Sequence, residues 1–146
     1  MAYARLLVHC AFSTSGRRKS ISAELQPALW AYMGGIARKH GCKALAVGGS
    51  ADHAHLLLSL PADLSVAKAM QLIKAGSSKW MHGQKRVTFS WQESYGAFTI
   101  GASQVGRTIA YIHSQPEHHK RVAFEDEFKS LLARYEVEYD PKFLFA

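Results

Sequence analysis

The stretch Asp52-His53-Ala54-His55-Leu56-Leu57-Leu58-Ser59-Leu60 organises the fold of this chain. Turn-prone residues precede it and a proline follows it, which predicts a β-strand. Because side chains alternate between the two faces of a strand, His53 and His55 share one face, while the opposite face is apolar. Histidines at positions i and i+2 place two neutral nitrogens within reach of one divalent ion. Taken alone, such a pair is more often explained by surface or hydrogen-bonded histidines.

The composition is typical of a soluble globular protein, with 48% hydrophobic and 20% charged residues among 146. This length predicts a single domain over residues 1–146. No apolar run approaches the roughly 20 residues that span a membrane, and the N-terminus lacks a signal-peptide layout. Cys10 and Cys42 fit no metal-site spacing and are too few for a disulfide framework, which predicts reduced thiols in the cytoplasm. The net charge of +7 favours a polyanionic partner, most often nucleic acid.

The remaining periodicity predicts alternating strands and helices. We expect strands over residues 3–14, 42–47 and 53–60, helices over 23–40 and 65–82, and a strand or hairpin within 87–100. This βαββαβ order is that of the ferredoxin-like or RRM-like α+β fold, in which helices cover one face of an antiparallel sheet and leave the other open. The first and third strands are central neighbours in that topology, so we expect His9 beside His53 and His55 on the open face.

A third helix is predicted over residues 103–115, and it carries two stripes. Val105, Ile109 and Ile112 form an apolar stripe at helical spacing. Beside it, Tyr111 and Gln115 are one turn apart, so a phenol and an amide point in the same direction. Packing of Tyr111 at the helix edge is the simpler interpretation, and a stripe that faces a metal ion is the alternative.

Basic residues in two segments are candidates for contact with a nucleic-acid backbone, although solvation of an exposed surface explains them too. They are Arg17, Arg18 and Lys19 in the loop after the first strand, and Lys68, Lys74 and Lys79 in the second helix.

Taken together, these motifs resemble those of the single-tyrosine HUH transposases of insertion sequences, a family that includes REP-associated tyrosine transposases. The resemblance rests on residues 52–59, on Ala110-Tyr111-Ile112-His113-Ser114-Gln115 and on Glu117-His118-His119, and it extends over nearly the whole chain. It implies that His53, His55 and Gln115 bind Mg²⁺ or Mn²⁺. It also implies that Tyr111 is the nucleophile and that helices C-terminal to the sheet carry it.

The same resemblance implies a reaction and its partners. Members of the family cut single-stranded DNA next to imperfect hairpins at the ends of a mobile element and rejoin the strands through a 5′-phosphotyrosine link. They typically work as homodimers, in which the tyrosine helix of one subunit often completes the histidine site of the other. We therefore expect a cytoplasmic, DNA-associated prokaryotic protein without a membrane partner.

Local features leave several alternatives open. Pro116 disfavours helical geometry at Gln115, so His118 or His119 is an alternative third ligand. Strand alternation points Asp52 away from the histidine face unless the turn redirects it. Ala54 stands where the family usually has a bulkier apolar residue. Two other functions also fit: a domesticated relative that processes repeated chromosomal palindromes, and a non-catalytic RRM-like module that binds nucleic acid.

Overall fold

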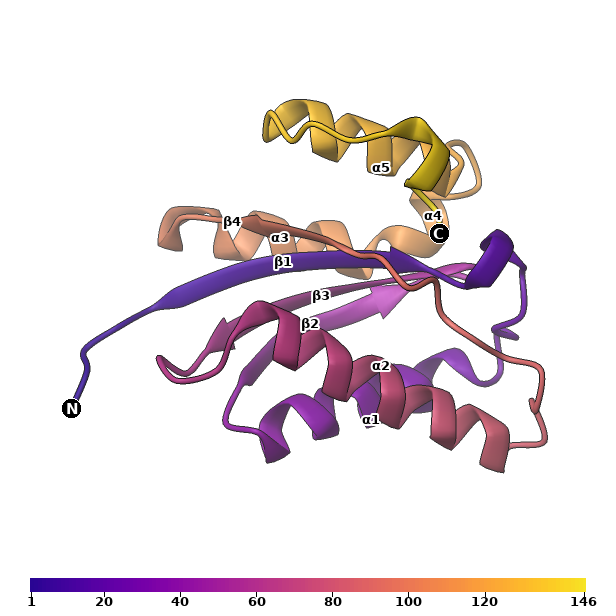
Figure 1. Cartoon of the computed structure of the whole chain (residues 1–146), viewed down its shortest axis with the longest axis horizontal. Coiled ribbons are helices and arrows are strands. Elements are labelled where there is room, and N and C mark those ends of the chain that lie inside the picture. The colour runs from indigo at the N-terminus through magenta and orange to yellow at the C-terminus, as the bar shows by residue number, and fades with distance from the viewer.

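A computed structural model of residues 1–146 shows a four-stranded sheet with helices on both faces (Figure 1). The strands are β1 (Leu6–Ser13), β2 (Lys43–Gly49), β3 (His53–Leu60) and β4 (Gly96–Thr99). All neighbouring strands are antiparallel, in the order β2-β3-β1-β4, so β3 and β1 are central as expected. The expected α+β class is therefore confirmed, and the elements follow the predicted βαββαβ order up to β4.

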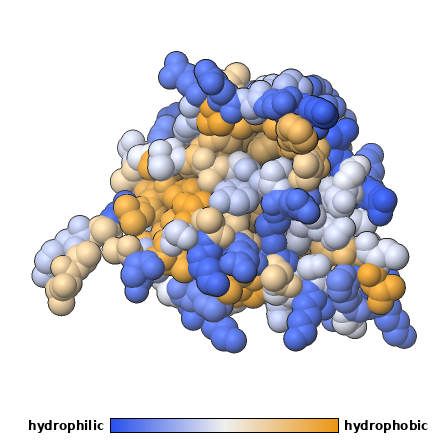
Figure 2. Space-filling model, in the orientation of Figure 1, coloured by the Kyte–Doolittle hydropathy of each residue, from blue (hydrophilic) through white to orange (hydrophobic).

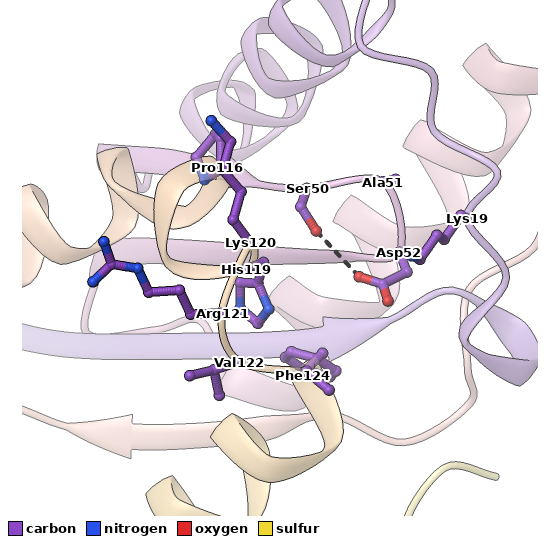
Figure 3. A pocket seen from close by; sticks show the side chains of 11 residues that line it. Lys19, Ser50, Ala51, Asp52, Pro116, His119, Lys120, Arg121, Val122 and Phe124 are labelled. Atoms are coloured by element: carbon purple, nitrogen blue, oxygen red, sulfur yellow. Dashed lines mark hydrogen bonds between the residues drawn. The ribbon is translucent and has the colours of Figure 1, made fainter.

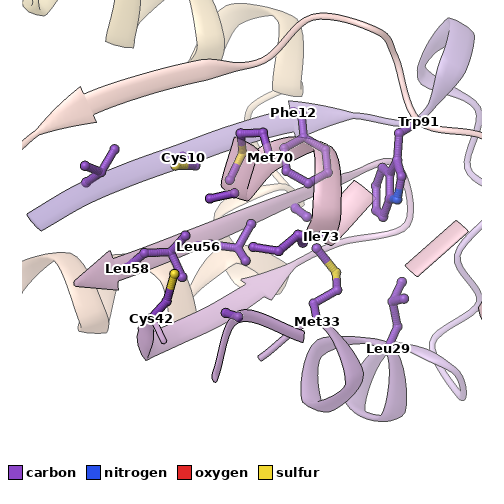
Figure 4. Packing of buried hydrophobic residues seen from close by; sticks show 14 of the residues in the cluster. Cys10, Phe12, Leu29, Met33, Cys42, Leu56, Leu58, Met70, Ile73 and Trp91 are labelled. Atoms are coloured by element: carbon purple, nitrogen blue, oxygen red, sulfur yellow. The ribbon is translucent and has the colours of Figure 1, made fainter. Parts of the chain in front are cut away.

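One face of the sheet carries the main apolar core. Helices α1 (Gln26–Lys39) and α2 (Val66–Gly83) cover this face. Side chains from both helices meet the apolar face of β3, represented by Leu56 and Leu58, as Figure 4 shows. This face is the one that the alternation of the histidine strand predicts to be buried.

The opposite face is also covered, so the expectation of an open face is wrong. Helices α3 (Val105–His113), α4 (Gln115–His118) and α5 (Phe124–Arg134) lie on it (Figure 1). The physical reason is that this face carries apolar residues as well as histidines. Leu57 packs with Ile112 of α3, and Ala11 packs with the apolar side of α5. Covering these side chains removes apolar surface from water.

Close contact between α3 and the sheet depends on Gly48 of β2. A Cβ atom at this position would lie 2.7 Å from the backbone carbonyl oxygen of Ile112, so a larger residue would push α3 away. The glycine thus lets the helix that carries Tyr111 rest directly on the strand next to β3.

Two predicted elements differ from the structure. The predicted strand within 87–100 is regular only over Gly96–Thr99, because the preceding aromatic residues turn into the core instead of alternating. There Trp91 packs edge-on against Phe12, and its indole N–H donates a 2.9 Å hydrogen bond to Ser77 Oγ. The predicted helix over 103–115 ends at His113, and α4 begins at Gln115.

Polar and apolar residues are unevenly distributed on the surface. Figure 2 shows apolar surface gathered near the N-terminal arm, where β1 begins, and hydrophilic residues over most of the rest of the visible rim. No helix in the structure combines the length and hydropathy that crossing a membrane requires.

Candidate functional site

His53 and His55 extend from β3 into the layer between the sheet and α3–α5, and both are completely buried. His53 Nδ1 lies 2.8 Å from Asp52 Oδ1 and 3.0 Å from Ser50 Oγ, because the tight turn before β3 bends Asp52 back toward the ring. Burial would raise the pKa of Asp52, but its hydrogen bonds with His53 and Ser50 outweigh burial and lower it. The ionised carboxylate therefore accepts the Nδ1–H of His53 and turns the Nε2 atom of the ring toward the interior of the layer.

The second histidine is oriented by His9 of β1, as the strand order predicts. His55 Nδ1 and His9 Nε2 are 2.8 Å apart, and both rings are buried. Burial, together with the nearby His55, lowers the pKa of His9 to about 3, so its ring stays neutral. The contact occupies Nδ1 of His55 and directs its Nε2 toward Glu127, 3.0 Å away.

Gln115 reaches the same point, although a proline follows it. It is the first residue of α4, where proline at the next position is tolerated because that residue needs no helical N–H bond. Its Oε1 lies 2.8 Å from His53 Nε2, and its Nε2 donates to Glu127 Oε2 at 2.9 Å. His119, one of the alternative ligands, also lies at the cluster, with its Nε2 2.9 Å from Glu127 Oε1. His118 is farther out, 3.5 Å from Glu127 Oε2 and one-third exposed.

Glu127 is the centre of the cluster, and it is not among the site residues predicted from the sequence. It is the only carboxylate among the buried residues of the chain, 4% exposed. It lies in the first turn of α5, where the helix dipole favours negative charge. Burial would raise its pKa, but hydrogen bonds with His119 and His55 outweigh burial and hold the pKa far below the usual value. A sequence signal exists: Glu127 interrupts the apolar stripe of this helix, between Phe124 and Phe128.

Tyr111 of the same chain completes the cluster from α3. Its phenol donates a hydrogen bond to Glu127 Oε2, and its ring packs edge-on against His55 at a centroid distance of 5.7 Å. Burial and the negative charge of Glu127 raise the pKa of Tyr111, so the phenol carries its proton near neutral pH. The predicted nucleophile and both predicted histidines therefore meet within one chain.

These donors fit a divalent cation. One ligand atom from each of four residues lies within 4.8 Å of all the others, and these residues are His53, His55, His119 and Glu127. His53 Nε2 also lies 2.8 Å from Gln115 Oε1, so an imidazole nitrogen and an amide oxygen lie together beside this set. Both kinds of atom are ligands for divalent cations. A set of imidazole and oxygen donors suits Mn²⁺, and it suits Mg²⁺ less well because Mg²⁺ prefers oxygen.

A cavity of about 400 Å³ opens beside this cluster (Figure 3). His119 and Asp52 lie on its wall, and both contact the buried donors, so the cavity leads from the surface to the cluster. The cavity is bordered by Lys19, Lys120 and Arg121. Of these, Lys120 pairs with Glu117 at the surface. The positive charge around the cavity matches a polyanionic ligand.

The other predicted basic residues lie elsewhere. Arg17 stacks its guanidinium over Phe145 at 4.2 Å, and Arg18 is exposed beside it. Lys68, Lys74 and Lys79 are on α2, on the face of the sheet away from the histidines (Figure 1).

Lys74 differs from the other two α2 lysines because it is half-buried. Its Nζ donates to the carbonyl oxygens of Glu93 and Ser94 at 2.9 and 3.1 Å. Burial lowers its pKa to about 8. A role of these lysines in DNA binding stays a prediction.

Comparisons with known proteins agree with this geometry. The family model described as "Transposase IS200 like" matches residues 2–115. One similar solved structure is a candidate transposase from Deinococcus radiodurans R1, 21% identical, with a TM-score of 0.63 over 78% of this chain and 93% of that one. Another is a REP-associated tyrosine transposase bound to a REP hairpin, 18% identical, with a TM-score of 0.62 over 84% of this chain and 73% of that one. At these identities the two structures show a shared fold. No curated protein matches the sequence.

Proposed function

Because this chain belongs to the family of IS200-like transposases, we propose that it cuts and rejoins single-stranded DNA through a covalent bond to Tyr111. The observation that carries this proposal is a half-buried phenol hydrogen-bonded to a buried carboxylate, in one cluster with two buried histidines next to a basic cavity. The structural neighbour bound to a REP hairpin supports hairpin-flanked single strands as the substrate.

The proposed reaction exchanges one phosphodiester for another. Tyr111 Oη attacks the phosphorus, a phosphorus–oxygen bond to tyrosine forms, and the bond to the 3′ oxygen breaks. Glu127 Oε2 already accepts the hydrogen bond of the phenol, so it is the nearest acceptor for the departing proton. The 3′ oxygen takes a proton and leaves as a hydroxyl. Because the 5′-phosphotyrosine link conserves the energy of the broken bond, a second 3′ hydroxyl reverses the step and seals the strand without ATP.

We further propose that His53, His55 and Gln115 hold Mg²⁺ or Mn²⁺, with Glu127 as an additional oxygen donor. When bound, the ion would withdraw negative charge from the phosphate and favour the phenolate form of the tyrosine. Asp52 and His9 contribute indirectly, because they occupy the Nδ1 atoms of the two histidines and turn both Nε2 atoms toward the cluster.

A homodimer remains part of the proposal because of the family resemblance. In this structure Tyr111 lies beside the histidines of its own chain, so the chemistry needs no residue from a second subunit. An exchange of tyrosine helices between subunits is therefore a separate prediction. Mixing a Tyr111→Phe subunit with a His55→Ala subunit tests it, because only exchanged helices restore activity.

The two alternative functions differ in how well they explain the cluster. The domesticated role on repeated palindromes shares all of this chemistry, and the likeness to the REP-associated transposase supports it equally. A screen of element ends against chromosomal palindromes separates these two roles. A non-catalytic module has no need for a phenol paired with a buried carboxylate.

The decisive experiment is to look for the covalent intermediate. Purified protein, a labelled hairpin-bearing single strand and Mn²⁺ should give a protein–DNA adduct that survives denaturing electrophoresis. Tyr111→Phe should abolish the adduct and keep DNA binding. Tyr32→Phe is the matched control, because this exposed residue stacks on Trp80 beyond the opposite face of the sheet. An adduct that persists in Tyr111→Phe contradicts the proposal.

A further inference from the structure

A second, smaller cavity of about 140 Å³ lies between α3 and α5, and Tyr111 forms part of its wall. It shares no lining residue with the cavity beside His119. Its wall is formed by His9, Ile100, Gln104, Arg107, Thr108, Tyr111, Leu131, Arg134 and Tyr135. Arg107 and Arg134 are the only charged residues in this lining at neutral pH, because burial keeps His9 neutral.

The two arginines are placed by the same helices that place the reacting groups. Arg107 precedes Tyr111 by four residues on α3, so the two side chains lie on one face of that helix. Arg134 follows Glu127 by seven residues on α5, again on one face. The charge of Arg134 acts on Tyr111, where it opposes the larger effects that raise the pKa of the phenol.

Neither arginine has a partner within the protein. Arg107 and Arg134 form no ion pair with a carboxylate and no side-chain hydrogen bond. The neighbouring Gln104 uses its Oε1 to accept the N–H of Gly101 at 2.8 Å, which leaves its amide hydrogens available. The cavity therefore offers two guanidinium groups and an amide donor, and no carboxylate competes for them.

This set of donors recognises a phosphate. Guanidinium groups match the oxygens of a phosphodiester with paired hydrogen bonds. The cavity is smaller than the roughly 300–1,000 Å³ that encloses a drug-sized ligand, so it suits a backbone phosphate better than a whole nucleotide.

We propose that Arg107 and Arg134 bind the backbone of the DNA strand that becomes joined to Tyr111, at the phosphate next to the one attacked. This inference rests on the proposed function. It divides the substrate between two cavities. One side of the cleavage point would lie along Arg107 and Arg134, and the other side along the cavity bordered by Lys19 and Arg121.

The test is the salt dependence of DNA binding, measured in EDTA so that no cleavage occurs. The probe is a fluorescent single strand with a stem-loop and random flanks. Each phosphate contact contributes about −0.7 to the slope of log K against log salt for a single strand. We therefore expect Arg107→Gln and Arg134→Gln each to make this negative slope shallower by about 0.7, and the double variant by about 1.4. Arg38→Gln, an exposed change on α1, is the matched control and should leave the slope unchanged.

Adduct formation by the unaltered protein is measured in parallel with Mn²⁺, so the two proposals fail separately. If the adduct forms and the Arg107 and Arg134 variants have the same salt slope as Arg38→Gln, the proposed phosphate site is wrong and the proposed cleavage reaction is supported. If the arginine variants have shallower slopes but no adduct forms, the phosphate contact is supported and the proposed cleavage reaction is wrong. Thermal melting of each variant establishes that the substitutions at these exposed positions leave the fold intact.

Discussion

The two faces of the sheet bury their side chains in different ways. The face under α1 and α2 is one continuous cluster of 18 buried apolar residues. The face under α3–α5 has two smaller apolar clusters, centred on Phe124 and on Leu57, with the histidines and Glu127 buried among polar partners. The first face stabilises the domain mainly through apolar burial, whereas the second buries several polar groups whose hydrogen bonds must be satisfied within the protein.

The buried polar side chains of the cluster all have hydrogen-bond partners. Ser22 Oγ is the one buried side-chain polar atom in the chain without a hydrogen-bond partner, and it is not part of the cluster. The two apolar clusters hold α3 and α5 in place, and the polar groups between them take their geometry from these helices. Substitutions on the two faces should therefore separate stability from metal binding.

The largest effect is expected from Leu56→Ala on the apolar face. This fully buried side chain is next to His55 in sequence but points to the opposite side of β3. Its loss should cost about 2–5 kcal/mol of unfolding free energy, measured by urea denaturation in EDTA. Mn²⁺ affinity of the folded variant, measured by calorimetry, should stay unchanged. A large loss of affinity would show that the two faces are coupled.

A smaller loss of stability is expected from Glu127→Gln on the polar face. The substitution removes the charged acceptor of His55 and His119, so stability in EDTA should fall by about 1–3 kcal/mol. Mn²⁺ affinity should fall as well, because a negative donor is lost. Glu125→Gln on the surface of the same helix is the control, with an expected change within about 0.5 kcal/mol. Unchanged affinity would remove Glu127 from the metal site.

Asp52→Asn should weaken metal binding with little effect on folding. Asp52 lies at the edge of the cluster, where its carboxylate accepts the Nδ1–H of His53. Loss of such a partner typically lowers metal affinity by about 10- to 100-fold. Mn²⁺ titration measures the effect, and Asp63→Asn in the exposed turn after β3 is the control. Equal affinities in the two variants would show that Asp52 does not orient His53.

The smallest effect concerns Lys74 and the pH dependence of stability. The pKa of Lys74 is about 8 in the folded protein and 10.5 for the free side chain. Between pH 8 and pH 10.5 this lysine is therefore protonated in the unfolded chain and mostly deprotonated in the folded protein. The contribution of Lys74 to stability should therefore rise as the pH increases from 8 to 10.5. The rise is small because the side chain is only half-buried. Urea denaturation measures the effect as a difference: the unfolding free energy of the unaltered protein minus that of Lys74→Met should grow across this range. The same difference taken with Lys68→Met should stay constant.

Local patterns correctly predicted which of these side chains lie together, whereas their roles in binding and catalysis stay predictions. Alternation placed His53 and His55 on one face of β3, and the element order placed His9 beside them. Helical spacing put Tyr111 and Gln115 on the same side, and both lie at the cluster even though the helix breaks between them. These features follow from neighbouring residues in the chain, whose relative directions are fixed by backbone geometry.

Only the tertiary structure decided how the site is completed. Glu127 is 72 residues from His55 in sequence, and nothing local shows that α5 turns it toward the sheet. The turn that bends Asp52 back, the covering of the histidine face and the half-burial of Lys74 likewise depend on packing between distant segments. The sequence by itself determined which elements form and which residues share a face, because strand and helix periods are local. The tertiary structure alone decided which partners meet across those faces, because that depends on the burial of apolar surface by the whole chain.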